Sequence, residues 1–232
     1  MKMKLALAAI AGCAALCLAL PAFGQTANVI FNGADPSDQV WNGVYAGVYD
    51  ATVTGAVNTN KVICDDYNNE VTGGESWTAT VLYASKLNAS NIDNTMFGAA
   101  IGLTGYTELA YLVNLEFTPG GGGYTVAELN SAIWAITSGG AGGPASWVNW
   151  NQLDSNAKSL VAWLETNVGT LSLSSYGNLF ILTPVSTTSP MTQEFWGVPE
   201  GGAALLYLLL AGLACFGAMC FSSKKEFGIR AA

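Results

Sequence analysis

The residues of this 232-residue chain that could do chemistry are a few carboxylates and one cysteine, because the sequence contains no histidine. Without histidine, Ser-His-Asp and Cys-His catalysis and histidine-ligated zinc are excluded. The densest carboxylates are Asp65, Asp66, Glu70 and Glu75. Paired carboxylates hydrolyse glycosides, which leaves a glycosidase as one alternative, but this spacing is equally typical of a solvated loop. We therefore expect no enzyme, no catalytic residue and no cofactor.

The same segment also offers oxygen atoms of the kind that calcium prefers. The side chains that carry them are those of Asp65, Asp66, Asn68, Asn69 and Glu70. Their spacing lacks the pattern of an EF-hand loop. A calcium site and a solvated loop both remain open, and we assign no metal ligand.

Cys64 stands alone in the middle of the chain, since the other four cysteines lie in apolar segments at the two ends. A disulfide within the middle part is therefore impossible. The apolar neighbours Val62 and Ile63 are typical of a strand interior, which favours a buried, unreactive thiol. A reactive thiol and an intermolecular disulfide are the alternatives.

The elements that must position these residues are strands at both ends of the middle part and helices between them. β-Formers bounded by Gly, Asn, Pro or Ser predict strands, and apolar residues at helical spacing predict helices. The predicted strands are 42–54, 61–67, 76–84, 178–184 and 192–198, and the predicted helices are 106–115, 126–137 and 153–167. The sequence thus predicts an α+β fold, rich in strands, with a helical middle.

The charge of residues 25–200 excludes one large class of partners. This part has 15 acidic residues, three lysines and no arginine, a net charge of −12. Such a charge repels phosphate backbones and anionic lipid head groups, so we expect no nucleic-acid partner. Its length fits one domain with enough apolar residues for a core.

The first 24 residues have the three parts of a secretory signal peptide. Lys2 and Lys4 precede an apolar stretch, 5–20, and small residues follow at Ala22 and Gly24. We place cleavage after Gly24, which makes 25–197 the exported domain. A lipobox ending at Cys13, or an uncleaved transmembrane helix, is the alternative.

The last 35 residues have the composition of an anchoring signal. Val198, Pro199 and Glu200 precede an uncharged run, 201–221, and the basic residues of the tail are Lys224, Lys225 and Arg230. At 1.5 Å per residue the run spans about 31 Å as a helix, enough to cross a bilayer. Because basic residues stand only after the run, the positive-inside rule predicts a membrane-anchored protein with a cytoplasmic C-terminus.

A Val-Pro-Glu motif, an apolar helix and a basic end, on a chain with a signal peptide, resemble the PEP-CTERM sorting signal, here residues 198–232. The resemblance implies an exosortase-like partner that cleaves near the motif. The protein would then be released to the cell surface or extracellular matrix of a Gram-negative bacterium. Without cleavage, it would stay a single-pass membrane protein.

A second resemblance lies within the exported domain. The Ile63-Cys64-Asp65-Asp66 motif and the later Asn130-Ser131-Ala132-Ile133-Trp134 motif resemble the thioester domains of bacterial surface adhesins. In that family the cysteine is joined to a glutamine, and the thioester acylates a nucleophile on the target. The resemblance implies that Cys64 is the thioester cysteine and that Asn130, one methylene shorter, occupies the glutamine position. Gln152 and Gln193 are conceivable alternative partners for Cys64.

These observations predict an exported envelope protein with a structural or adhesive role. One alternative is a covalent adhesin that uses Cys64, and another is a plain single-pass membrane protein whose ectodomain binds carbohydrate. Envelope polysaccharide is the ligand that an aromatic surface would suit, although aromatic residues are more often core. The candidate aromatic residues are Trp41, Tyr45, Tyr49, Trp147 and Trp150.

Overall fold

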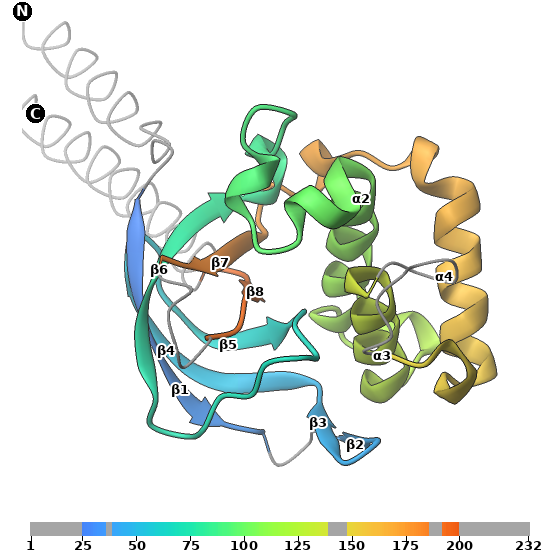
Figure 1. Cartoon of the computed structure of the whole chain (residues 1–232), viewed down its shortest axis with the longest axis horizontal. Coiled ribbons are helices and arrows are strands. Elements are labelled where there is room, and N and C mark those ends of the chain that lie inside the picture. Colours follow the sequence, from blue (N-terminus) through green and yellow to red (C-terminus); the bar gives the residue numbers. More distant parts are fainter. Residues whose placement is uncertain (1–24, 36–38, 139–147, 186–191, 200–232) are drawn as a thin grey trace, which may run out of the picture.

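The structure, a computed structural model, describes residues 25–35, 39–138, 148–185 and 192–199. These residues form a closed β-barrel with a layer of helices packed beside it, which confirms the predicted α+β class (Figure 1). The predicted signal peptide, 1–24, and membrane helix, 201–221, lie outside the described residues. Among the helices that are described, none is long and apolar enough to cross a membrane.

Six antiparallel strands close the barrel in the order β1-β4-β5-β8-β7-β6, and a small hairpin of two more strands extends from it. The barrel strands are β1 (Thr26–Gly33), β4 (Val48–Gly55), β5 (Thr59–Cys64), β6 (Ser76–Tyr83), β7 (Phe180–Pro184) and β8 (Phe195–Gly197). The hairpin strands are β2 (Gln39–Trp41) and β3 (Val44–Ala46). Since β6 pairs with β1, the described strands of the barrel leave no open edge.

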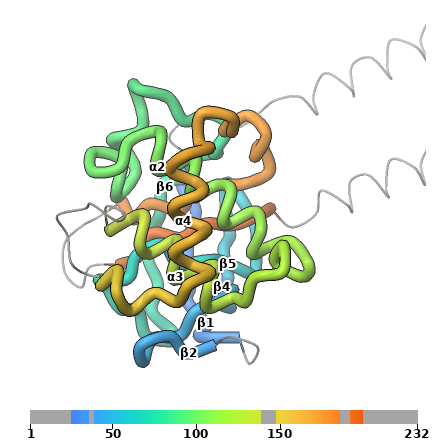
Figure 2. Tube along the Cα trace, turned by 90° about the vertical axis from the view of Figure 1, so that its right-hand side faces the viewer, coloured from blue at the N-terminus to red at the C-terminus, as the bar shows by residue number. Residues whose placement is uncertain are grey.

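The three α-helices that the structure describes lie between β6 and β7 in the chain, as the predicted helical middle requires. They are α2 (Gly98–Glu116), α3 (Val126–Thr137) and α4 (Ser155–Asn167), and in the side view they lie together in front of the barrel (Figure 2). Short 3-10 helices complete the connections: η1 (Ala84–Lys86), η2 (Ile92–Asn94), η3 (Gly121–Gly123), η5 (Trp150–Gln152), η6 (Val168–Thr170) and η7 (Leu173–Tyr176). Helix α3 begins at its predicted residue because Thr125 and Glu128 form a capping box.

The strands nearest the helices are buried on both faces. In β5, Val62 and Cys64 belong to the cluster inside the barrel, whereas Ile63 packs with the helices. Phe195 and Trp196 of β8 divide in the same way. Successive residues of a strand point to opposite faces. A strand that is buried on both faces therefore needs consecutive apolar residues.

Several elements differ from their prediction. Strand β5 ends at Cys64 and not at 67, β8 is shorter than the predicted 192–198, and β2 was not predicted. Strand β1 was not predicted, although Ala27, Val29 and Phe31 alternate with exposed residues and fill the barrel. Helix α2 begins eight residues before the predicted 106, because its first turn precedes a kink. At that kink Gly102 has a φ of 61° and a ψ of −167°, so the regular helical spacing is broken there.

Candidate functional site

The connection from β5 to β6 carries the residues that the sequence singled out for chemistry. Its first residues, Cys64 to Asp66, are buried, and those from Tyr67 to Gly73 rise to the surface. Strand β5 delivers this segment to the junction between barrel and helices, where α3 and β8 pack against it. The inner and outer halves of the segment therefore meet different surroundings.

The thiol of Cys64 is enclosed by the barrel. Its Sγ atom donates to the carbonyl oxygen of Asp66, 3.2 Å away, and accepts the N–H of the same residue at 3.3 Å. Burial, reinforced by the negative charge of Asp66, raises the pKa of the Cys64 thiol well above its usual value. The sulfur is thus held as a thiol, the form that is a poor nucleophile.

Asn130 reaches the backbone of Cys64 from helix α3. Its Nδ2 donates to the Cys64 carbonyl oxygen at 2.9 Å, and the indole of Trp134 donates to the same oxygen at 3.1 Å. Its Oδ1 accepts the N–H of Gly47 at 2.9 Å. We call this set, Cys64, Asn130, Trp134 and Gly47, the β5 joint. Both ends of the Asn130 amide are engaged there, and its partner on Cys64 is the carbonyl oxygen.

A second buried polar group lies beside the β5 joint, where two carboxyls meet. Asp65 and Glu194 are both 0% exposed, and their side chains are in hydrogen-bonding contact. Burial raises the pKa of both, and their mutual repulsion adds to the effect on Asp65. Two buried carboxyl groups in contact cannot both be charged, because the repulsion between the charges is too large. The pair therefore shares a proton.

The hydrogen bonds of the pair locate that proton on Asp65. Glu194 already accepts from the hydroxyls of Tyr106 and Thr183 and from the N–H of Met96, the last at 2.8 Å. Within the described ranges, Asp65 accepts only the indole N–H of Trp196, at 2.7 Å on Oδ2, and its Oδ1 meets no donor there. A proton on Asp65 would let this residue donate to Glu194, with which its side chain is in contact. We call these two residues the carboxyl pair.

The turn after Asp65 is held by hydrogen bonds to Asp66 and from Gln193, which lies just before β8. The carboxylate of Asp66 accepts the N–H groups of Asn68 and Asn69, at 3.1 and 3.2 Å. The amide of Gln193 donates to the carbonyl oxygens of Asp66, at 3.0 Å, and Asn69. Gln193 therefore shares the Asp66 carbonyl with the thiol of Cys64, and its amide holds the loop in place.

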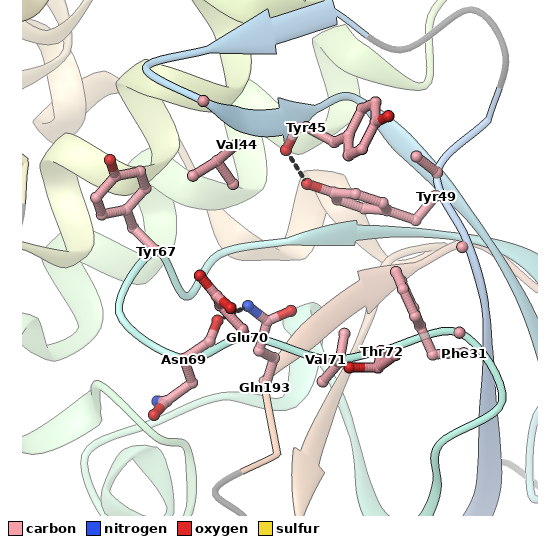
Figure 3. Close-up of a pocket in the computed structure, with 14 residues that line it drawn as sticks. Phe31, Val44, Tyr45, Tyr49, Tyr67, Asn69, Glu70, Val71, Thr72 and Gln193 are labelled. Atoms are coloured by element: carbon pink, nitrogen blue, oxygen red, sulfur yellow. Dashed lines mark hydrogen bonds between the residues drawn. The ribbon is translucent and has the colours of Figure 1, made fainter.

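The outer half of the segment forms one wall of a cavity of about 410 Å³, which we call the tyrosine cavity (Figure 3). Tyr45 and Tyr49, from β3 and β4, lie on one side, and Asn69, Glu70 and Thr72 lie on the other. Tyr45 is 55% exposed at the mouth. Tyr49 is buried, and its hydroxyl donates to the carbonyl oxygen of Tyr45. The lining is completed by Phe31, Gly33, Ala34, Gly43, Val44, Tyr67, Val71, Gly73 and Gln193.

Tyr67 connects this cavity to the β5 joint. Its ring lies 5.1 Å from that of Trp134 and 5.7 Å from that of Trp41, measured between centroids. Tilted and edge-on aromatic contacts of this kind are favourable beyond simple burial. Trp41 therefore packs against Tyr67, which lines the cavity, but does not line the cavity itself.

The predicted aromatic candidates divide accordingly. Tyr45 and Tyr49 line the cavity, Trp41 and Trp150 pack against the helical core, and Trp147 lies outside the described residues. Sequence reasoning missed Tyr67, Asn69 and Gln193 as cavity residues, because no local pattern brings segments so far apart together.

The candidate carboxylates do not converge on a common point. Asp65 faces Trp196, Asp66 caps its own turn, Glu70 lines the tyrosine cavity, and Glu75 accepts the N–H of Thr72. In the described parts of the chain, no three His, Cys, Asp or Glu side chains come together as metal ligands. The open question of a calcium site thus finds no supporting cluster among those residues.

The sorting motif is only partly described. Val198 and Pro199 follow β8 and line a shallow cavity with Lys61 and Phe117. Glu200 and the basic tail residues Lys224, Lys225 and Arg230 lie outside the described residues. Lys61 itself is paired with Asp35 and Asp50.

Comparisons with known proteins give one similarity. No family model matches this chain, and no curated protein matches its sequence. Among solved structures, it is similar to the N-terminal thioester domain of protein F2 like fibronectin-binding protein from Streptococcus pneumoniae. The identity is 13%, the match covers 74% of this chain and 92% of that one, and the TM-score is 0.41. At that score the similarity carries no argument about function.

Proposed function

We propose that this protein is an exported surface protein with an adhesive role, whose domain binds neutral carbohydrate noncovalently in the tyrosine cavity. The observation that carries the proposal is the lining of that cavity. Three tyrosines from separate segments surround a space of about 410 Å³, and amide and carboxylate groups stand opposite them. Concave sites of this size, with apolar walls and a few polar groups that orient the ligand, are typical of small-ligand binding.

The chemistry of the lining suits a sugar. The faces of Tyr45 and Tyr67 offer flat apolar surface for the C–H side of a pyranose ring, while their hydroxyls stay polar. Glu70 is exposed and would accept hydrogen bonds from sugar hydroxyls, and the side-chain oxygen of Asn69 would accept as well, because its Nδ2 already donates to the Asp66 carboxylate. A ligand that stacks on one wall and bonds to the other would use both sides of the cavity.

The charge of the domain favours a neutral glycan. Residues 25–200 carry a net charge of −12, and Glu70 adds a negative charge within the cavity itself. A polysaccharide bearing carboxylate, sulfate or phosphate groups would be repelled. A neutral chain pays no such cost, so we expect neutral envelope or matrix polysaccharide as the partner.

The proposal extends to where the domain is displayed. A signal peptide over 1–24 would export it, and the Val198-Pro199-Glu200 motif, the apolar run and the basic tail would act as a PEP-CTERM-like sorting signal. An exosortase-like enzyme and the membrane are then its processing partners. The protein would be anchored with its C-terminus in the cytoplasm until the tail is cleaved and the domain is released to the surface or matrix.

The noncovalent form of the proposal is supported by the β5 joint. The Asn130 amide has hydrogen-bond partners at both ends, and burial keeps the Cys64 thiol protonated. Both groups have structural partners in the interior, whereas the cavity beside them has polar side chains turned to solvent.

The test is calorimetric titration of the full-length chain with neutral and acidic oligosaccharides. We expect saturable binding of a neutral oligosaccharide, weakened about tenfold by Tyr45→Ala through loss of ~1.4 kcal/mol of stacking. Glu70→Gln should weaken it as well, and Trp163→Ala, an exposed aromatic on α4, should leave it unchanged. Tighter binding of acidic oligosaccharides, or binding that survives both cavity substitutions, would contradict the proposal.

A further inference from the structure

Another cavity, of about 190 Å³, lies in the helical layer and has no part in the proposed function. It forms at the kink of α2, where Ile101, Thr104 and Glu108 face Ile136 of α3 and Glu165 of α4. We call it the kink cavity. All three helices of the layer contribute to it.

The kink makes the room for this cavity. Gly102 has a φ of 61°, in the left-handed region that residues with a side chain rarely adopt. A Cβ added at Gly105 would lie 2.5 Å from the side chain of Ile101. Two glycines within one turn therefore let the first segment of α2 bend away, while Thr104 and Glu108, four residues apart, stay on one helix face.

Glu108 is the unusual member of the lining. The residue is only 7% exposed, yet in the part of the chain that the structure describes its carboxylate has no hydrogen bond and no ion pair. Its carboxylate oxygens are not among the buried unpartnered atoms of the described residues, so solvent reaches them through the cavity. The other charged residue in the lining is Glu165, which is itself acidic. Burial and the charge of Glu165 raise the pKa of Glu108 to about 7.

We infer that the kink cavity binds a primary ammonium group, such as that of an alkylamine or a lysine side chain. The two carboxylates would receive the ammonium hydrogens, and the hydroxyl of Thr104 would accept a third. Ile101 and Ile136 would pack along the alkyl stem. A bound cation would supply the partner that Glu108 lacks and would separate the like charges of Glu108 and Glu165.

The lining favours an ammonium group over the other cations. Calcium takes six to eight oxygen ligands, and the side chains here offer oxygens from Thr104, Glu108 and Glu165 alone. A quaternary ammonium has no N–H to donate and prefers an aromatic cage, which the lining does not contain. A primary ammonium has three donors, matching three acceptors.

The experiment is a titration of the full-length chain with n-propylammonium chloride, against sodium chloride, tetramethylammonium chloride and calcium chloride at equal ionic strength. We expect saturable binding of n-propylammonium alone. Because Glu108 must lose its proton to bind a cation, affinity should rise about tenfold from pH 6 to pH 8. Glu165 is the other titratable group that faces it from the lining.

Three variants make the result specific. Glu108→Gln should weaken binding more than tenfold and remove its pH dependence. Glu165→Gln should weaken binding and move the pH profile downward, since the repulsion that helps to raise the pKa of Glu108 would be gone. Glu75→Gln, in the barrel layer, should bind like the unmodified chain. Equal binding of tetramethylammonium, preference for calcium, no saturable binding, or an unaffected Glu108→Gln variant would each overturn the inference.

Discussion

The two halves of the segment after β5 use similar residue types in opposite ways. From Cys64 to Asp66, a thiol and two carboxyls are enclosed between barrel and helices, and each has a hydrogen-bond partner. From Tyr67 to Gly73, polar and aromatic side chains line an open cavity. A polar or aromatic residue is therefore a candidate for ligand recognition only where solvent reaches it and some of its hydrogen-bonding capacity is unused.

The difference predicts a graded response to substitution. Changes in the inner half should cost stability, because they leave buried donors or acceptors unsatisfied. Changes in the outer half should cost binding and little stability. The carboxyl pair and the tyrosine cavity mark the two extremes.

The largest loss of stability is expected for Glu194→Ala. It removes the acceptor of Tyr106, Thr183 and Met96 and leaves Asp65 without its partner, so we expect a loss of roughly 3–5 kcal/mol in the free energy of unfolding. Urea unfolding of the full-length chain measures it. Glu70→Ala, a carboxylate of the outer half, is the matched control and should change stability by less than about 0.5 kcal/mol.

Asp65→Asn sharpens the same comparison. The amide N–H of the introduced asparagine can donate to Glu194 at every pH, in place of the shared proton. Its amide oxygen can accept from the indole of Trp196. We expect a far smaller loss than for Glu194→Ala, and a stability that falls less as the pH rises above the usual pKa of a carboxyl group. An Asp65→Asn chain as unstable as Glu194→Ala would show that no proton lies between the two carboxyls.

Asn130→Ala should have the next largest effect. It removes two buried hydrogen bonds of the β5 joint and leaves the N–H of Gly47 unpaired, for a loss of about 2 kcal/mol. Asn130→Gln should also destabilise the domain, since the site is fully buried and an added methylene overpacks it. A chain stabilised by Asn130→Gln would instead mean that the site is built for the longer side chain.

Glu108→Gln tests the intermediate case, a largely buried residue whose carboxyl reaches solvent through the kink cavity and has no hydrogen bond or ion pair within the described residues. Its pKa is about 7 in the folded chain, against 4.5 as its usual value. The folded chain thus holds this proton more tightly, and stability is lost as the pH rises from 4.5 through 7. Partial solvent screening at the cavity reduces that loss to roughly 1–2 kcal/mol. Urea unfolding at pH 5 and at pH 8 measures this effect. Between the two pH values, the free energy of unfolding of the variant should rise by this amount relative to that of the unmodified chain.

Tyr45→Ala should have the smallest effect on stability, within about 0.5 kcal/mol, because the ring is more than half exposed. The same variant is expected to lose carbohydrate affinity. If thermal unfolding showed a large loss of stability instead, Tyr45 would belong with the inner half and the distinction between the two halves would fail.

The sequence predicted the class of the fold and most of its elements because those depend on local patterns. Helix α3 was predicted with its observed bounds from the helical spacing of its apolar residues, and the capping box of Thr125 and Glu128 fixes its start in the structure. The pairing of Asp65 with Glu194 had no such signal, because it depends on how β8 packs beside β5. Tyr45 could be named as a candidate from its type, but not distinguished from Trp41, whose burial is decided by the contact with Trp134.

The noncovalent nature of the β5 joint is best tested by peptide mass mapping of the full-length chain, denatured and alkylated before digestion with trypsin. The tryptic peptide with Cys64 runs from Val62 to Lys86, and the one with Asn130 runs from Leu87 to Lys158. We predict an alkylated Cys64 and two separate peptides of unmodified mass. An unalkylated Cys64 peptide joined to the Asn130 peptide, with a mass lower by one ammonia, would show a covalent bond and contradict the assignment of this joint to structure.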